Sequence, residues 1–234
     1  MAFNKSVELK PVFNQFKNIK MKKSILIAVV FFCNATLFAQ SEKYIKAMEN
    51  LVPAVDTTHS PEKLTELANS FERIANAEKT QWLPFYYAAL CQVNIANMLF
   101  QTQQLDKIDA ILDKAEPMMN KAEELEKDNS EIMCLKKMFN TGRMMADPMN
   151  RYMTYGPAAS EALEIAKKLN PDNPRVYLLQ GIDKYYTPEQ YGGSKTEGKE
   201  LFNEAAKKFE TFKPASSIHP SWGVGQVKYF LSLE

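Results

Sequence analysis

Apolar residues recur along the chain after residue 40 at the spacing that an α-helix gives to one of its faces. A clear case follows Ser60-Pro61, where the apolar positions form one helical stripe: Leu64, Leu67, Ala68, Phe71, Ile74 and Ala75. No segment shows the strict alternation of a half-buried β-strand. The pattern therefore predicts an all-α protein.

The same periodicity predicts helices with short connections between them. We expect them at Ser41–Leu51, from Pro61 behind an N-cap at Ser60, and at Trp82–Phe100, Gln104–Lys127, Ser130–Met145, Ala158–Leu169, Pro174–Tyr186, Ser194–Phe212 and Trp222–Leu233. Trp82–Phe100 is apolar nearly all round, which indicates a helix covered on more than one side.

Proline, serine and asparagine mark several of the expected boundaries. Pro117 should kink or divide its helix, and Asp147-Pro148 should form an irregular link. The run from Asn170 to Pro174 ends one helix and begins the next, and Ser194 with Glu197 forms a capping box. In the last helix the apolar side is expected to be Val224, Val227 and Leu231.

A triplet of small, large and small side chains recurs in the second half of the chain and, less regularly, before it. It has the spacing small-x3-large-x2-small and occurs at Ala159, Leu163 and Ala166, followed by Pro171, and at Gly198, Phe202 and Ala205. Looser copies are Ile108, Leu112, Ala115 and Leu67, Phe71, Ile74. A second pattern, Pro84, Tyr87, Leu90, Cys91, returns as Pro174, Tyr177, Gln180, Gly181.

These spacings resemble the tetratricopeptide repeat, in which two antiparallel helices recur with a period of about 34 residues. Small residues let the two backbones cross closely, and large residues fill the space beside the crossing. The resemblance implies a right-handed superhelix of about four helical hairpins over 41–212, plus a C-terminal helix. The connections are longer and the aromatic positions less regular than the family pattern, so the repeats are degenerate. The Tyr191–Ser194 loop and Trp222-Gly223 look like features of exported bacterial members.

In tetratricopeptide arrays the first helices of the hairpins line a concave face that binds peptides or extended protein segments. Carried over by position, the resemblance implies a candidate binding face at Phe85, Ala88, Gln92, Arg175, Leu178, Ile182 and Tyr185. The alternative for each residue is packing against neighbouring helices. The paired Lys, Asn and Arg of the family's carboxylate clamp are not recognisable.

The segment from Met21 to Gln40 has the form of a secretory signal peptide. Lys22 and Lys23 precede an apolar run, and cleavage is expected after Ala39. The run is shorter than the roughly 20 residues that span a bilayer, so a membrane anchor is the weaker interpretation. We expect residues 1–20 to be a gene-model artefact, 21–39 the signal peptide, and 40–234 the helical repeat domain.

Charge and cysteine content narrow the functional classes. Residues 1–39 hold six lysines and one acidic residue, so the remainder of the 29 basic and 28 acidic residues has a net charge near −4. An acidic, arginine-poor chain is a poor partner for nucleic acid. Cys91 and Cys134 both fall in apolar helical stretches, where packing as free thiols is favoured over a disulfide.

No arrangement typical of an enzyme is evident. Gly192–Thr196 lacks the upstream glycine and the strand of a phosphate loop, so Ser194 and the glycines are better explained as helix ends. His59 and His219 are the only histidines, too few for a usual zinc site. Met145, Met149 and Met153 have a spacing that suits Cu(I), but Pro148 interrupts that helix. We therefore predict no metal and no cofactor.

The sequence favours an exported, non-enzymatic protein, periplasmic or secreted, that binds a protein or peptide on its concave face. The alternative is a small-molecule-binding accessory component of a solute uptake system. The aromatic groups at Trp82–Tyr87 and Tyr185–Tyr191 motivate it, and an enclosed apolar pocket of about 300 Å3 or more would favour it. An enzyme with an unfamiliar carboxylate site is the third hypothesis.

Overall fold

The computed structural model describes residues 42–233. The expected upstream segment, the signal peptide and its cleavage site lie outside the described residues. The chain divides into a unit Met1–Ile45, of which residues 42–45 are described and helical, and a unit Lys46–Glu234. Everything that follows concerns the second unit.

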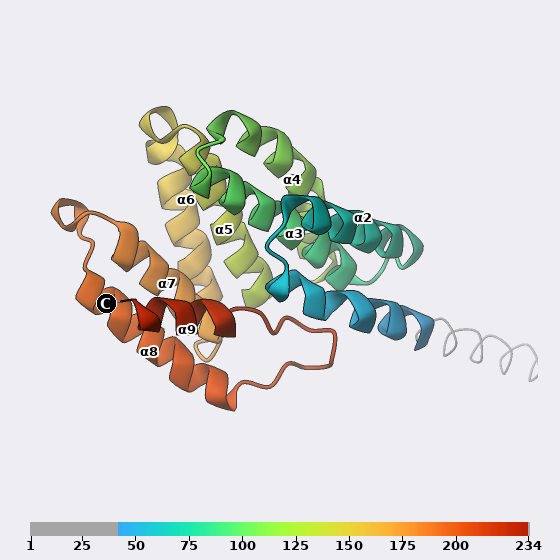
Figure 1. Cartoon of the computed structure of the whole chain (residues 1–234). Helices are drawn as coiled ribbons and strands as arrows, with labels where there is room; N and C mark the ends of the chain where they lie inside the picture. The colour runs from blue at the N-terminus through green and yellow to red at the C-terminus, as the bar shows by residue number, and fades with distance from the viewer. Residues whose placement is uncertain (1–41, 234) are drawn as a thin grey trace, which may run out of the picture. The chain divides into compact units, whose positions relative to one another are not determined.

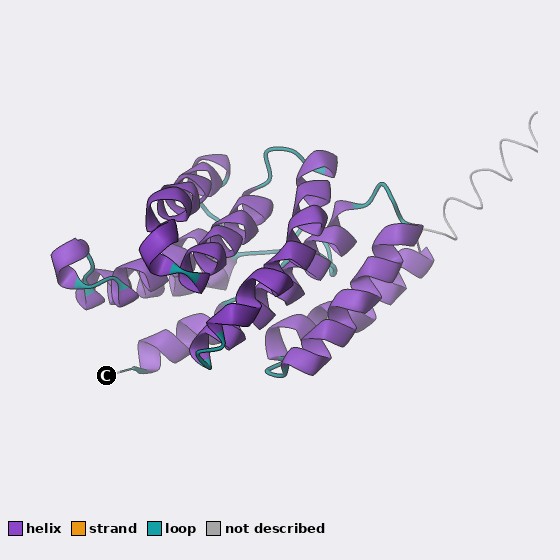
Figure 2. Cartoon of the chain, turned by 90° about the horizontal axis from the view of Figure 1, so that it is seen from above, coloured by secondary structure: helices purple, strands orange, loops and turns teal. Residues whose placement is uncertain are grey.

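The second unit is built from helices joined by short loops, and the described residues contain no β-strand (Figure 2). Residues 46–57 are helical. The longer helices after them are α2 (Pro61–Ala77), α3 (Trp82–Gln101), α4 (Ile108–Leu125), α5 (Ser130–Ala146), α6 (Pro148–Leu169), α7 (Pro174–Tyr186), α8 (Lys195–Thr211) and α9 (Val224–Ser232). Short 3-10 turns lie at Leu105–Lys107 and Glu189–Tyr191. The predicted all-α class is confirmed.

Two of the boundaries are capped as the sequence predicts, and a third is capped in the same way. The Ser60 side chain accepts a hydrogen bond from the Lys63 backbone N–H ahead of Pro61, and the Ser194 hydroxyl accepts one from Glu197. The Asn173 side chain accepts one from Arg175 at the start of α7. Gly192 adopts φ +86°, a conformation that favours glycine, so this loop ends one turn and leads into α8.

The helices pack mainly as neighbours along the chain, in the manner of stacked hairpins (Figure 1). The pairs α3 with α4, α5 with α6, and α7 with α8 form the closest contacts, and α2 packs against α3. The first helices of successive hairpins also touch, α3 with α5 and α5 with α7. The architecture is therefore an all-helical, repeat-like stack.

The predicted triplets lie at the hairpin contacts. Ile108, Leu112, Ala115, Leu163, Ala166, Phe202 and Ala205 are all buried, most of them completely. In α2 the register differs from the prediction, because Leu67 and Ile74 are only half-buried. The buried face of α2 is instead Leu64, Ala68, Phe71 and Ala75.

Two glycines allow α7 and α8 to approach closely. A Cβ added to Gly181 would lie 2.5 Å from the Phe202 ring, and one added to Gly198 would lie 3.1 Å from the Gly181 carbonyl oxygen. Both positions are the small members of the repeated patterns. The sequence interpretation of small residues at the crossing is therefore confirmed for this hairpin.

Prolines account for the boundaries that the sequence placed wrongly. The irregular link expected at Asp147-Pro148 is a single-residue break, because Pro148 occupies the first position of α6. The helix therefore begins ten residues before the predicted Ala158. Pro117 and Pro157 lie inside α4 and α6 without dividing them.

The core-facing side of helix α9 agrees with the predicted one only at Val227. Val227 and Phe230 are buried, whereas Val224 and Leu231 are partly exposed. Cys91 and Cys134 are both free and buried, as favoured. Within the described residues, no helix combines the length and apolar character needed to cross a membrane.

Candidate functional site

Arg175, one of the predicted ligand-binding residues, is fully buried at the start of α7. Its guanidinium donates to a Glu131 carboxylate oxygen at 2.9 Å and to the Pro220 carbonyl oxygen at 2.6 Å. The Phe212 and Trp222 rings lie on it, with centroids 4.8 and 5.2 Å from Cζ. Arg175 therefore binds the chain's own C-terminal region.

The segment between α8 and α9, residues 213–223, is named the strap here. In Figure 1 it leaves the end of α8, runs toward the helix at residues 46–57 and returns into α9. Tyr87 of α3 donates a hydrogen bond to the Ile218 carbonyl oxygen (3.1 Å), and the Trp222 indole N–H donates to the Tyr86 hydroxyl (2.8 Å). The strap thus lies on side chains of α3 and α7, the first helices of their hairpins. We call the surface formed by Tyr86, Tyr87 and Arg175 the first-helix face.

The charged centre beneath the strap is incompletely paired. Burial raises the pKa of Glu131 to about 6, and the attraction of Arg175 and the hydrogen bond from Asn173 offset that effect only in part. The Glu131 Oε2 and Arg175 Nε atoms are buried and find no hydrogen-bond partner among the described residues. Burial also raises the pKa of the Tyr86 phenol. Burying these charges costs free energy of folding, and the Pro220 carbonyl of the strap offsets part of that cost by accepting a hydrogen bond from Arg175.

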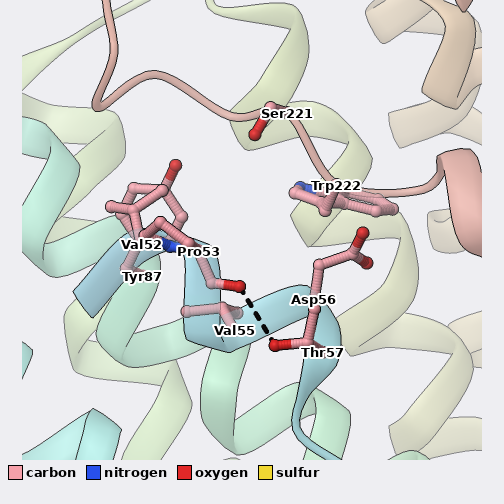
Figure 3. Close-up of a pocket in the computed structure, with 8 residues that line it drawn as sticks. All are labelled: Val52, Pro53, Val55, Asp56, Thr57, Tyr87, Ser221 and Trp222. Atoms are coloured by element: carbon pink, nitrogen blue, oxygen red, sulfur yellow. Dashed lines mark hydrogen bonds between the residues drawn. The ribbon is translucent and has the colours of Figure 1, made fainter. Parts of the chain in front are cut away.

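A small pocket lies under the strap, and Figure 3 shows its lining. Its volume is about 140 Å3, and Asp56, Tyr87 and Trp222 form its polar and aromatic walls. The Gly223 backbone N–H donates to Asp56 at 3.4 Å, and burial raises the pKa of Asp56. The pocket is smaller than the roughly 300–1,000 Å3 of usual ligand pockets. It is not the enclosed apolar pocket of about 300 Å3 or more that would favour the small-molecule hypothesis.

A second, open depression of about 460 Å3 lies between the ends of α4 and α6 and the start of α5. Met133, Ile165 and Leu169 give it an apolar floor. Its charged residues are three carboxylates and one amine, from Glu123, Glu124, Asp128 and Lys127. This acidic depression is unsuited to an anionic ligand.

The predicted binding residues are divided between the core and the surface. Phe85, Ala88, Gln92, Arg175 and Leu178 are buried, whereas Ile182 and Tyr185 are half-buried. The structure brings no single exposed face together from these seven positions. Their proposed ligand role stays a prediction, and the buried ones serve packing here.

A cluster of four rings, two of them exposed, forms where α7 ends beside α9. It consists of Tyr185, Tyr186, Tyr229 and Phe230, and is named the aromatic surface below. Tyr186 and Tyr229 are 63% and 58% exposed, and both rings pack edge-on against Phe230, at 6.0 and 5.5 Å. Phe230 in turn stacks on the buried Phe202 ring at 4.5 Å. The exposed rings of Tyr186 and Tyr229 thus pack on Phe230, which the buried Phe202 ring holds in place.

The sequence predicted two of the four residues of the aromatic surface, Tyr185 and Tyr186, as part of an aromatic group. Tyr185 was a predicted site residue, and the group at Tyr185–Tyr191 suggested a small-molecule ligand. Tyr229 and Phe230 were missed because α9 was assigned Val224 and Leu231 as its apolar side. The adjacent aromatic pair at 229–230 was the signal that could have placed a second set of rings there.

The three methionines at i, i+4 and i+8 spacing do not lie on one helix, as Pro148 led us to expect. Met145 belongs to α5, whereas Met149 and Met153 belong to α6 and are 93% and 81% exposed. Among residues 42–233 there is no group of three or more His, Cys, Asp or Glu side chains placed to hold a metal ion. The break at Pro148 thus has the effect that the sequence indicated.

Comparison with known proteins gives one informative likeness. No protein-family model matches the chain, and no curated protein sequence does. A solved structure, the HusA haemophore from Porphyromonas gingivalis, is similar over 80% of this chain and 90% of that chain, with a TM-score of 0.71 and 34% sequence identity. The likeness is to a binding protein, and its fold is shared with this chain.

Proposed function

Because this chain belongs to the family of the HusA haemophore, we propose that it is a carrier that binds haem as its cargo and catalyses no reaction. The observation that carries the proposal is the 34% identity over 90% of the haemophore chain. The proposal replaces a protein or peptide ligand, the first choice from the sequence, with a small molecule, which was the alternative.

The aromatic surface is the part of the described chain that best suits a flat, apolar macrocycle. Tyr186 and Tyr229 expose ring area to solvent, and Phe230 beneath them is held by Phe202. Rings of this kind bind a planar ligand by offset stacking, at about 0.5–1.5 kcal/mol for each pair beyond the area that they bury. A rigid base keeps the entropy cost of binding low.

Haem also needs an iron ligand and a partner for its carboxylates. A tyrosine phenolate is an established type of haem ligand, and Tyr186 and Tyr229 both present phenols. Burial, with the neighbouring phenols, raises the pKa of Tyr186, so its phenol is protonated in the haem-free chain. Binding to iron as a phenolate would therefore release a proton. The Lys195 ammonium, 5.5 Å from the centroid of the Tyr185 ring, supplies a positive charge at the edge of the surface.

The two cavities fit haem less well. The strap pocket of about 140 Å3 is too small for a macrocycle. The acidic depression has the volume, but its three carboxylates would repel the haem carboxylates. Charge and size therefore both favour the aromatic surface.

We place the carrier outside the cytoplasm, periplasmic or secreted, because the sequence at 21–39 has the form of a signal peptide. The helical hairpins are proposed to be degenerate tetratricopeptide repeats. A protein or peptide ligand is the second candidate function, and one observation favours it: a non-helical segment of the chain, the strap, already lies on the first-helix face.

The test is a titration of haem followed by its Soret absorbance. Tyr186→Ala and Tyr229→Ala should each weaken binding by roughly 3–10-fold through the lost ring contact. The matched control is Tyr152→Ala, which removes a tyrosine of similar exposure, 60%, from α6. Equal effects of all three variants, or none, would reject the aromatic surface as the site.

The phenylalanine variants separate stacking from iron ligation. Tyr186→Phe and Tyr229→Phe each keep the ring and remove the phenol oxygen. The variant that loses the iron ligand should change the haem spectrum and weaken haem binding, while its affinity for metal-free protoporphyrin stays unchanged. Absence of saturable haem binding by the wild-type chain would reject the function itself.

A further inference from the structure

We propose that Arg175 is a positioning residue for the aromatic surface: by holding the strap from beneath, it fixes the start of α9 and hence Tyr229 and Phe230. This inference rests on the proposed haem site, and it assigns a role to a buried residue that cannot itself touch the ligand.

The first link is between Arg175 and the strap. Arg175 is fully buried, and its Nη2 donates to the Pro220 carbonyl oxygen at 2.6 Å. The Trp222 ring lies on the guanidinium, with its centroid 5.2 Å from Cζ. Charge-assisted hydrogen bonds are among the stronger ones in proteins, so Arg175 fixes the strap at two neighbouring residues.

The second link is between the strap and α9. Trp222 is followed by Gly223, which caps α9 with φ +108°, a conformation that favours glycine. The Trp222 indole donates to Tyr86 and the Gly223 N–H donates to Asp56. The two residues that precede α9 are therefore tied to α3 and to the helix at residues 46–57.

The third link is along α9 to the ligand surface. Tyr229 and Phe230 lie within the second turn of this nine-residue helix. Phe230 also stacks on Phe202 of α8, so one end of α9 is held by ring packing and the other by the strap. A helix of this length is marginal without such tertiary contacts. Loss of the strap contact should therefore loosen α9 and misplace the Tyr229 ring.

Three titratable side chains surround Arg175, so replacing it changes the electrostatics beneath the strap. Glu131 of α5 faces it, Asp56 lies near enough to feel its charge, and Tyr86 of α3 feels both Glu131 and Arg175. Replacement by an apolar side chain leaves the Pro220 carbonyl without this donor and leaves the Glu131 carboxylate with the Asn173 amide as its donor. The strap loses its contact with Arg175, while α9 keeps its contact with α8.

The test compares two buried arginines in the full chain. Arg175→Met removes the strap contact, whereas Arg143→Met removes an arginine that pairs with Asp109 and Asp113 of α4, away from the strap. Both arginine side chains are 9% exposed or less, so both substitutions remove a buried arginine from an ion pair. Only the first should act on α9.

Two readouts are expected to separate the variants. In the haem-free chain, amide hydrogen exchange over residues 224–230 should be at least tenfold faster in Arg175→Met than in the wild type, and unchanged in Arg143→Met. Haem affinity by Soret titration should be at least threefold weaker in Arg175→Met, with Arg143→Met like the wild type. Arg175→Lys, which keeps the charge, should recover part of both.

The outcomes are distinguishable. Equal exchange over 224–230 in the two methionine variants overturns the positioning role, whatever haem does. A wild-type chain that binds no haem rejects the proposed function, while the exchange measurement still decides whether Arg175 positions α9. If Arg175→Met does not fold, Trp222→Phe, which removes the indole donor to Tyr86, is measured in its place with the same expected exchange.

Discussion

The contact between α7 and α8 offers a sharp test of why these helices pair. We consider Gly181→Ala, which adds one methyl group to the middle of α7. The added Cβ would lie 2.5 and 2.6 Å from two atoms of the Phe202 ring and 3.2 Å from the Gly198 carbonyl oxygen. Phe202 is fully buried and stacked on Phe230, so its ring has no free space to move into.

Two opposing effects determine the expected change in stability. Alanine is favoured over glycine within a helix by about 1 kcal/mol. Overpacking a filled core costs about 1–3 kcal/mol, and the 2.5 Å contact with a stacked ring indicates the upper part of that range. The free energy of unfolding should therefore fall by about 1–2 kcal/mol in Gly181→Ala.

The measurement is urea unfolding followed by circular dichroism at the helical band, with an unchanged slope as the check on two-state behaviour. Gly225→Ala in α9 is the matched control, because a Cβ there meets nothing within 4 Å. It should be neutral or slightly stabilising, by less than about 1 kcal/mol. A Gly181→Ala chain as stable as the wild type would refute the close-crossing explanation.

Two further predictions concern buried titratable groups. Burial raises the pKa of Glu131 to about 6 from its ordinary 4.5, so the folded chain holds this proton more tightly. Its contribution to stability is fully present below about pH 4.5 and is lost as the pH rises through 6. Urea unfolding should show the wild type losing up to ~2 kcal/mol relative to Glu131→Gln between pH 4.5 and 7, and a constant difference contradicts this. Burial raises the pKa of the Cys91 thiol to about 12 and that of Cys134 as well, so a thiol-specific reagent should modify both only on unfolding. Rapid modification of the native chain would be inconsistent with their packing.

Much of the fold was predictable because local signals and packing agree. Ser60-Pro61 and Asn173-Pro174 combine a capping side chain with proline at the first helical position, and both boundaries were predicted correctly. Pro148 carries the same signal, but the preceding Asp147 was interpreted as part of a longer link. Aspartate there does not cap α6 with its side chain, so the local pattern was weaker.

The site was less predictable because it depends on contacts between distant segments. The strap has no helical periodicity, and nothing in its sequence indicates that Pro220 would meet Arg175 or that Trp222 would meet Tyr86. Arg175, which the resemblance placed on the binding face, is buried beneath the strap. Tyr185 and Tyr186 were recognisable as an aromatic group. Their contact with the aromatic residues of α9, however, depends on the packing of α9 against α8, which no local pattern predicts.

The central claim is that a flat porphyrin lies on the aromatic surface. We would test it by titrating the haem-free chain with a diamagnetic gallium(III) porphyrin and following backbone and aromatic NMR signals. The account predicts the largest ring-current shifts at Tyr185, Tyr186, Tyr229 and Phe230, with Met133, Ile165 and Leu169 of the acidic depression unmoved. Shifts centred on the depression or on the strap pocket, with the four aromatic residues unaffected, would contradict it.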